Sequence, residues 1–369
     1  MTYALAPTFH ETYAARLLQT EDGIGALCNQ ALGGEEVDAF THAALEGYAA
    51  MLQGPGKRIR GVLTITGYEL GRDLYPPAAG SEPLDDTAIA TGAAGTMEAL
   101  HAYLLGFDDM ADRADLRRGL PTVHTHMNGF LQKHGVEGDT AELARSYAEI
   151  AGLILQHEAQ ATLLGLPAPP VNIQRAAYIL NRGLVSTGRG QGRDMLPQGF
   201  GAGLRHALQT ATDKTAHYTF TLPLQVGAAL AGAPLSSLHD VERYAFFSGL
   251  AFQLRDDIIS TFGDSKTTGK DALSDVREGK ETILVALARD RANERGQHIL
   301  RTVLGNMAVE HADVQALLGV IRETGALDIA GALVDRLAQQ AVAAIPQDWP
   351  EFHTQFLRDL TLSGAKREK

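Results

Sequence analysis

Apolar side chains recur along most of the chain at the spacing of an α-helix. Between residues 36 and 53, for example, Val37, Phe40, Ala44 and Tyr48 follow one another at intervals of three or four positions. The same spacing predicts further helices over residues 86–112, 140–164, 173–196, 239–262 and 281–304. Clusters of glycine and proline separate these runs, which is typical of loops between helices.

One short segment, residues 61–70, carries the Val, Ile and Thr content of a β-strand. A lone strand has no partner with which to form a sheet, so we predict a buried helix there. No Ser/Gly/Pro-rich linker and no fixed repeat divides the chain. The pattern therefore predicts one all-α domain over residues 1–369, with a peripheral segment at 1–30 and a charged tail at 365–369.

Composition and charge narrow the possible functions. The chain has 369 residues, 45% hydrophobic and 21% charged, as in an ordinary globular protein. Its 44 acidic and 32 basic residues give a formal net charge of -12, which disfavours a nucleic-acid partner. The single cysteine, Cys28, has no partner for an intrachain disulfide, and the N-terminus lacks a signal-peptide pattern, so we expect a cytoplasmic protein.

The longest stretch without Asp, Glu, Lys or Arg covers residues 215–239. It is long enough to cross a bilayer, but it contains two helix-breaking prolines and several polar side chains. We therefore predict a buried helix kinked near Pro223 and no membrane span.

Three aspartates near the end of one predicted helix are the strongest candidates for chemistry. Asp108 and Asp112 are spaced i,i+4, which puts both carboxylates on one helix face, whereas Asp109 lies about 100° around the helix. Two carboxylates about 6 Å apart repel by about 3 kcal/mol at an effective dielectric of about 20, which favours a cation between them. All-oxygen ligands suit Mg²⁺, and the guanidiniums of Arg117 and Arg118 suit a metal-bridged polyanion. A solvated acidic helix surface is the alternative.

A second acidic pair and a basic cluster lie elsewhere in the chain. Asp256 and Asp257 end an aromatic-rich predicted helix and are followed by Lys270 and Lys280 in glycine-marked loops. Each lysine alone would be an ordinary surface charge, but chance rarely produces this order. Residues 57–60 place three basic side chains within four positions. They form either the basic start of a helix or a pocket for a second anion that needs no metal.

Six motifs in this order resemble those of the isoprenyl (polyprenyl) diphosphate synthases, the trans-prenyltransferases. They are Gly-Lys-x-x-Arg (Gly56–Arg60), His-x6-DDxxD-x4-RRG-x-P (His101–Pro121), GQ-x2-D (Gly190–Asp194), Lys-Thr (Lys214-Thr215), FQ-x2-DD (Phe252–Asp257) and GK-x4-D-x3-GK-x-T (Gly269–Thr282). One motif would be weak support, whereas six in register are specific. The resemblance implies a single large isoprenoid synthase-like helical bundle around a central apolar cavity, assembled as a homodimer.

The resemblance also implies a role for each matching residue. The proposed metal ligands, for three Mg²⁺ ions per active site, are Asp108, Asp112 and Asp256, with Asp109 and Asp257 as supporting carboxylates. The implied contacts to the allylic diphosphate are Arg117, Lys214 and Lys270, with Lys280 as a supporting charge. The implied binding set for isopentenyl diphosphate is Lys57, Arg60, His101 and Arg118. Thr215 and Gln253 would face the developing carbocation, and Tyr103 and Leu104 would floor the pocket that receives the growing chain.

The predicted function is a short-chain synthase that condenses isopentenyl diphosphate with an allylic diphosphate. The aromatic ring of Tyr103 resembles that of geranylgeranyl synthases, so we expect a C20 or C15 product, geranylgeranyl or farnesyl diphosphate. Ser260 stands where the family's second motif usually has a third aspartate. Two alternatives stay open, the first of them because of this departure. One is a non-catalytic subunit of a heteromeric synthase. The other is a class I terpene cyclase, which takes one diphosphate and gives no reason for Lys57 and Arg60.

Overall fold

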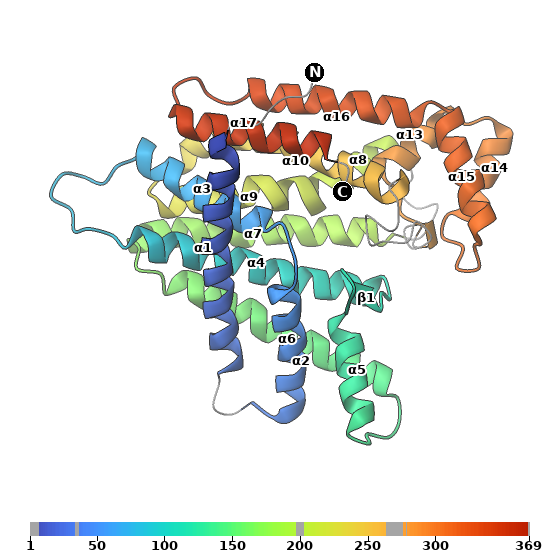
Figure 1. Ribbon diagram of the computed structural model, residues 1–369, viewed down its shortest axis with the longest axis horizontal. Helices are drawn as coiled ribbons and strands as arrows, with labels where there is room; N and C mark the ends of the chain where they lie inside the picture. Colours follow the sequence, from blue (N-terminus) through green and yellow to red (C-terminus); the bar gives the residue numbers. More distant parts are fainter. Residues whose placement is uncertain (1–6, 34–36, 197–202, 263–275, 278, 368–369) are drawn as a thin grey trace. The chain divides into compact units, whose positions relative to one another are not determined.

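The computed structural model describes residues 7–33, 37–196, 203–262, 276–277 and 279–367. These residues are mostly helical, which confirms the predicted all-α class (Figure 1). Within the described ranges the only strands are β1 (Leu116–Arg117) and β2 (Leu120–Pro121), which pair antiparallel. The chain divides into two compact units. The N-terminal unit comprises His10–Ile179 and Pro223–Leu235, and the C-terminal unit comprises Met1–Phe9, Leu180–Leu222 and Ser236–Lys369.

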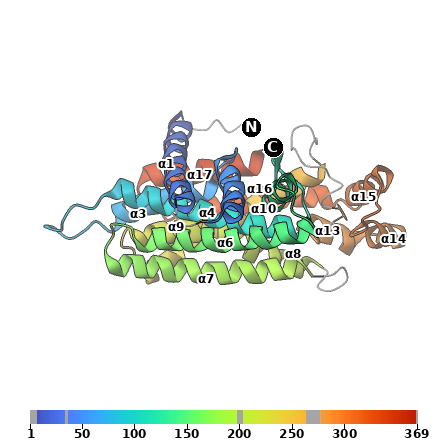
Figure 2. The same cartoon turned by 90° about the horizontal axis from the view of Figure 1, so that it is seen from below.

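The N-terminal unit is built around α4, which packs against α3 and α6 (Figure 1, Figure 2). Helices α2 and α5 also pack against α6. The helices that lie wholly or mostly in this unit are α1 (Pro7–Leu32), α2 (Ala39–Gln53), α3 (Ile59–Leu74), α4 (Asp86–Ala111), α5 (Val123–Lys133), α6 (Thr140–Leu164) and α9 (Leu222–Leu230). The unit also holds the beginning of α7 (Pro170–Asp194). Apolar side chains fill the contact face of α4, where Ala93, Ala94 and Met97 are completely buried.

Aspartate caps set the beginnings of three helices in this unit. Asp38 accepts hydrogen bonds from the backbone N–H groups of the first turn of α2, and Asp139 does the same for α6. Asp85 accepts a hydrogen bond of 2.9 Å from the N–H of Ala88 at the start of α4. Each cap satisfies backbone donors that have no partner within the helix.

The C-terminal unit is built around α10, which packs against η1, α13, α16 and α17 (Figure 1). Its elements, besides the end of α7, are α8 (Leu204–Thr210), the π-helix η1 (Ala211–Thr221), α10 (Leu238–Phe262), α13 (Ile283–Arg291), α14 (Glu294–Val303), α15 (His311–Glu323), α16 (Ala326–Ala343) and α17 (Glu351–Lys366). The short 3₁₀ turn η2 (Leu235–Ser237) precedes α10. Leu254, Leu284 and Leu300 form part of its fully buried core.

Several predicted elements agree with the structure, and two do not. The helix predicted over 140–164 is α6 to the residue, and the strand-like segment 61–70 lies inside the buried helix α3, as predicted. The single helix predicted over 281–304 is wrong, because the structure has α13 and α14 there. The side chain of Asn293 accepts a hydrogen bond of 3.0 Å from the N–H of Gly296 and so begins a new helix.

The stretch before Pro223 has an unusual helical register. In η1 the hydrogen bonds span five residues, and the N–H of Leu222 still bonds to the carbonyl of His217. Pro223 has no N–H to donate, so a regular ladder cannot continue through it. The helical backbone nevertheless runs from η1 directly into α9 and ends after Leu230. Residues 215–239 thus contain the end of η1, then α9, the turn η2 and the start of α10, in place of one kinked helix. None of the described helices has the length and apolar character that crossing a membrane requires.

Candidate functional site

The C-terminal end of α4 carries the first acidic motif. Asp108 lies in the last turn and Asp112 caps the helix, with its N–H donating to the Asp108 carbonyl at 2.8 Å. Both side chains are half-buried, whereas Asp109 is completely buried. The helix therefore places Asp108 and Asp112 one turn apart in partly solvated positions, as the i,i+4 spacing predicts.

The β1–β2 hairpin returns Arg117 to the end of α4. Its Nε and Nη2 atoms both lie 2.6 Å from Oδ1 of Asp109, and Nη2 lies 3.6 Å from Oδ2 of Asp108. Burial raises the pKa of Asp109 to about 6, although the guanidinium opposes this shift. The buried Asp109 thus holds Arg117 beside Asp108.

His101 lies on the same helix, α4, and positive side chains from other elements surround it. Burial lowers the pKa of His101 well below its usual range, and the guanidiniums of Arg60 and Arg118 lower it further. Arg60 lies in the first turn of α3 and Arg118 in the hairpin. Three of the four residues predicted to bind isopentenyl diphosphate are therefore close enough to act on one another electrostatically.

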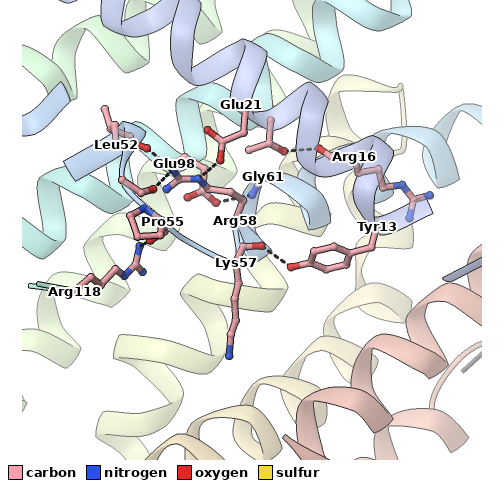
Figure 3. A network of polar contacts seen from close by, with 12 residues as sticks. Tyr13, Arg16, Glu21, Leu52, Pro55, Lys57, Arg58, Gly61, Glu98 and Arg118 are labelled. Carbon is pink, nitrogen blue, oxygen red and sulfur yellow. Dashed lines mark hydrogen bonds and ion pairs between the residues drawn. The ribbon is translucent and has the colours of Figure 1, made fainter. Parts of the chain in front are cut away.

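The fourth residue of that set, Lys57, precedes α3. Its side chain is exposed, and its carbonyl oxygen accepts a hydrogen bond from the hydroxyl of Tyr13 on α1. Figure 3 shows the Lys57 side chain pointing away from the neighbouring Arg58. The structure thus separates the two consecutive basic residues, one toward the interior and one toward solvent.

The two residues predicted to control chain length, Tyr103 and Leu104, are both half-buried on α4. The ring of Tyr103 lies against α6 at Gly152, where an added Cβ atom would be 3.0 Å from Cδ2 of the ring. That Cβ would also be 2.6 Å from the hydroxyl of Tyr48 on α2. Glycine at this position gives both rings the space that they occupy.

In the C-terminal unit, Lys214 lies in η1 and pairs with Asp194 at the end of α7. The ammonium Nζ is 2.6 Å from Oδ2 of Asp194. An added Cβ at Gly190, one turn before Asp194, would be 2.5 Å from the backbone N of Lys214. The GQ-x2-D motif therefore has a structural explanation. Gly190 lets the backbones of α7 and η1 approach each other, and Asp194 holds the ammonium of Lys214. Thr215, next in the chain, is half-buried.

The second acidic motif lies near the end of α10. Gln253 Nε2 donates to Oδ1 of the buried Asp257 at 2.6 Å, while Asp256 is exposed. Ser260, at the position of the missing third aspartate, donates to the Asp257 carbonyl at 3.2 Å. Its hydroxyl therefore satisfies the backbone of its own helix.

Asp256 has a partner that the sequence analysis did not predict. Nη2 of Arg367, in the charged tail, lies 2.6 Å from Oδ1 of Asp256, and the same guanidinium stacks 3.9 Å from the centroid of the Phe252 ring. The two charged residues are 111 positions apart. The sequence signal was only the basic character of the tail, which does not identify a partner.

Of the two lysines in the last motif, the structure describes Lys280. Lys280 is half-buried and follows Gly279, whose φ of +68° is the left-handed conformation that glycine adopts readily. Lys270 lies outside the described residues. The positions predicted for Lys270 and Lys280 therefore stay predictions.

The donors at the end of α4 fit a magnesium ion. Among the residues that the structure describes, no three His, Cys, Asp or Glu side chains gather into a ready-made metal cage. Mg²⁺ commonly takes one or two carboxylates and completes its shell with water and phosphate oxygens. Asp108 and Asp112 can supply those carboxylates, and the buried Oδ2 of Asp109 is an acceptor with no hydrogen-bond partner in the described chain.

The chain is similar to known proteins in both sequence and fold. The sequence matches the model of a family described as polyprenyl synthetase over residues 42–321. It is 30% identical to the geranylgeranyl diphosphate synthase of Sulfolobus acidocaldarius, over 84% of this chain and 88% of that protein. It is 29% identical to the geranylfarnesyl diphosphate synthase of Aeropyrum pernix, over 76% of this chain and 80% of that protein.

The fold also resembles solved structures. The geranylgeranyl pyrophosphate synthase of Corynebacterium glutamicum, determined in complex with isoprenyl diphosphate and magnesium, has a TM-score of 0.86 and is 28% identical. That comparison covers 94% of this chain and 97% of the other. The likeness therefore extends over nearly the full length of both proteins.

Proposed function

Because the chain belongs to the polyprenyl synthetase family, we propose that it is a short-chain trans-isoprenyl diphosphate synthase acting on isopentenyl diphosphate and an allylic diphosphate. The observation that carries this proposal lies in the N-terminal unit alone. An acidic helix end, Asp108 with Asp112, accompanies a separate basic cluster around His101. The first suits a metal-bridged diphosphate and the second a diphosphate bound without metal. A reaction that transfers the prenyl group of one diphosphate, which leaves, to a second diphosphate substrate uses both kinds of site.

In the proposed reaction the allylic C–O bond breaks, leaving an allylic cation and a diphosphate. Asp108, Asp112 and Asp256 are the proposed ligands for magnesium, at three ions per active site, and bound magnesium neutralises charge on the leaving diphosphate. This metal requirement is supported by the Corynebacterium glutamicum complex, which holds magnesium. The proposed side-chain contacts to the same diphosphate are Arg117, Lys214 and Lys270, with Lys280 in support.

The chain's own contacts prepare two of these cations. Asp109 fixes the guanidinium of Arg117 through two N–H groups, and Asp194 fixes the ammonium of Lys214. Because both cations are held before substrate arrives, little reorganisation is needed as charge develops on the leaving group.

The second half of the reaction is carbon–carbon bond formation. Lys57, Arg60, His101 and Arg118 are the proposed set that holds isopentenyl diphosphate so that its double bond attacks the cation. Thr215 and Gln253 would stabilise the cation through the dipoles of their oxygens. Loss of a proton from the condensed cation to the departed diphosphate restores a double bond and completes the step.

Product length is proposed as C20 or C15. The names of the relatives above specify geranylgeranyl diphosphate, which is C20, and geranylfarnesyl diphosphate, which is C25, so they support C20 over C15. The aromatic ring of Tyr103, packed against Gly152, supports a short product because the ring takes up space beside the half-buried Leu104. Both side chains are proposed to limit the length of the growing chain.

We also propose that the protein forms a homodimer through α6. Four large apolar side chains on one side of this helix are strongly exposed, namely Leu143, Ile150, Leu153 and Leu164 at 38%, 47%, 53% and 59%. Exposed apolar stripes of this kind commonly mark subunit interfaces. Light scattering of the purified protein tests the proposal, with the double variant Ile150→Glu and Leu153→Glu expected to be monomeric.

The experiment that tests the function is direct. Purified protein is incubated with Mg²⁺, labelled isopentenyl diphosphate and C5, C10 or C15 allylic diphosphates, and the products are separated by length. Elongated diphosphates support the proposal. A cyclic hydrocarbon formed from one allylic substrate would identify a terpene cyclase, and an absence of turnover would favour a non-catalytic subunit, which Ser260 leaves open.

A further inference from the structure

Arg58 adopts a backbone conformation that arginine rarely takes. It lies directly before α3, with a φ of +46° in the left-handed region. Side chains with a Cβ atom are disfavoured there, whereas glycine is not. An arginine at this position therefore needs contacts that compensate for the backbone.

Those contacts come from three acceptors around a buried guanidinium (Figure 3). Nε of Arg58 donates to Oε1 of Glu21 on α1 at 2.7 Å, and Nη2 donates to the carbonyls of Leu52 and Gly54. The Arg58 side chain is only 4% exposed. One guanidinium thus ties the end of α2, the segment that follows it and α1 together.

The preceding residue is fixed from the same helix. The hydroxyl of Tyr13, eight residues before Glu21 on α1, donates to the carbonyl of Lys57. Burial raises the pKa of Tyr13 to about 12, so the hydroxyl keeps its proton and stays a donor. Helix α1 therefore holds Lys57 by its backbone and Arg58 by its side chain.

Arg118 of the hairpin closes the same segment from the other side. Its Nη1 donates to the carbonyl of Pro55 at 2.7 Å. An added Cβ on Gly56 would lie 2.8 Å from Nη1 of Arg118 and 3.0 Å from Nη1 of Arg58. Both guanidiniums therefore pack against Gly56, and they contact the short segment before α3 while residues 55–57 stay exposed.

We infer that Arg58, held by Glu21, is a positioning residue for the homoallylic substrate. Its side chain turns away from Lys57 and fixes the segment that presents Lys57 and Arg60 to the diphosphate of isopentenyl diphosphate (Figure 3). Arg58 does not itself contact that substrate. The inference rests on the proposed function, and it predicts that losing the guanidinium affects one substrate and spares the other.

Arg58→Gly is the informative variant, because glycine keeps the left-handed backbone and removes only the side-chain contacts. We expect the KM for isopentenyl diphosphate to rise about tenfold, as the loss of hydrogen bonds to a charged group allows. The kcat and the KM for the allylic diphosphate should change by less than about threefold. Arg58→Lys should behave similarly, since one ammonium cannot replace a fork that binds three acceptors.

Two further variants separate positioning from a general loss of stability. Arg72→Ala removes another arginine–carboxylate pair, with Asp86, from the far end of α3, and should leave both KM values unchanged. Glu21→Gln weakens the same pair from its other side and should raise the same KM, which keeps the test available if Arg58→Gly does not fold. In a Lys57→Ala background, Arg58→Gly should have a smaller effect than in the wild type.

Several outcomes would overturn the inference. An unchanged KM for isopentenyl diphosphate in Arg58→Gly would do so, as would an equal rise in both KM values or full additivity with Lys57→Ala. If the wild type shows no turnover, the proposed function fails, and calorimetry of isopentenyl diphosphate binding then decides about Arg58 alone. A Kd weakened about tenfold in Arg58→Gly would support the positioning role, and an unchanged Kd would refute it.

Discussion

Arg367, one residue beyond the end of α17, donates a hydrogen bond of 2.6 Å to the carboxylate of Asp256 near the end of α10. The same guanidinium stacks on the ring of Phe252. The backbone carbonyl of Arg367 accepts a hydrogen bond of 2.7 Å from Nε of Arg255. The proposed magnesium ligand of the second acidic motif is therefore paired with a cation supplied by the C-terminal tail. A metal ion that binds Asp256 must compete with this guanidinium or share the carboxylate with it.

Removing Arg367 should make the second acidic motif easier to load with metal. We expect Arg367→Met to lower the Mg²⁺ concentration for half-maximal activity by about threefold, in line with the modest strength of exposed ion pairs. Methionine retains an apolar contact with Phe252, so stability should change little. Mg²⁺ titration of the initial rate measures the effect. Arg358→Met, which alters a contact within α17, is the control, and an unchanged or higher Mg²⁺ requirement in Arg367→Met would contradict the competition.

Neutralising Asp108 and neutralising the buried Asp109 should have different effects on kcat and stability. Asp108→Asn should lower kcat by about 10²–10³-fold, because a ligand for charge neutralisation in the transition state is lost, with little change in melting temperature. Asp109→Asn should affect stability as well, because the completely buried carboxylate anchors Arg117. Steady-state kinetics and thermal unfolding measure the two effects. The same substitution at the exposed Asp115, Asp115→Asn, provides the control. An Asp108→Asn enzyme with wild-type kcat would refute the metal assignment.

Shortening the side chain of Tyr103 should lengthen the product. The ring lies against Gly152 on α6, so Tyr103→Ala opens space on that side of α4. We expect the product distribution to move to longer chains by at least one C5 unit. Chromatography of the dephosphorylated products measures it. Phe107→Ala removes an exposed ring from the same helix and should leave the distribution unchanged. If Tyr103→Ala makes the wild-type product, Tyr103 does not limit chain length.

His101 should contribute a pH dependence to folding stability. Burial and the charges of four arginines, Arg60, Arg118, Arg117 and Arg58, hold the pKa of His101 well below its ordinary value of 6.5. The unfolded chain then binds more protons at this site than the folded protein does between the two pKa values. The free energy of unfolding therefore falls as the pH drops below about 6.5 and levels off above it.

His101→Gln should weaken this dependence. Urea unfolding of wild type and variant between pH 5 and 8 measures it, and the stability difference between the two proteins should move in favour of the variant as the pH falls. A difference that stays constant across this range would show that His101 does not titrate as its surroundings require. His124 and His217, whose pKa values burial also lowers, contribute to both proteins alike.

Local pattern was enough to predict much of the fold and part of the site. The bounds of α6 follow from its apolar period and its Asp139 cap, and both are local properties of the chain. The common face of Asp108 and Asp112 follows from helical geometry alone. The break between α13 and α14 was missed because Asn293 interrupts an apolar period that continues on both sides.

The contacts made by distant residues could not be predicted in this way. No periodicity in the sequence links Arg367 to Asp256 across 111 positions. The identity of residue 58 as arginine likewise does not predict a left-handed backbone conformation there. Helix α1 was also missed, although its residues Tyr13 and Glu21 fix the segment before α3. These features depend on tertiary packing, which selects one partner among many similar charges.

The close approach of α7 to η1 yields a test with a matched control two residues further along the same helix. An added methyl group on Gly190 would lie 2.5 Å from the backbone N of Lys214, whereas one on Gly192 meets nothing within 4 Å. Gly190→Ala must therefore push η1 away and should lower the free energy of unfolding by about 1–3 kcal/mol. Gly192→Ala should raise it by about 0.5–1 kcal/mol, because alanine favours the helix.

The same pair of variants also tests the role of Lys214. Displacing η1 moves the Lys214 ammonium away from Asp194, now 2.6 Å distant, so Gly190→Ala should lower kcat as well as stability. Gly192→Ala should keep wild-type kcat, since it leaves that ion pair in place. Thermal unfolding and steady-state rates, measured on both variants, decide the matter. A Gly190→Ala protein that is destabilised but keeps full kcat would mean that the position of Lys214 does not matter to the reaction.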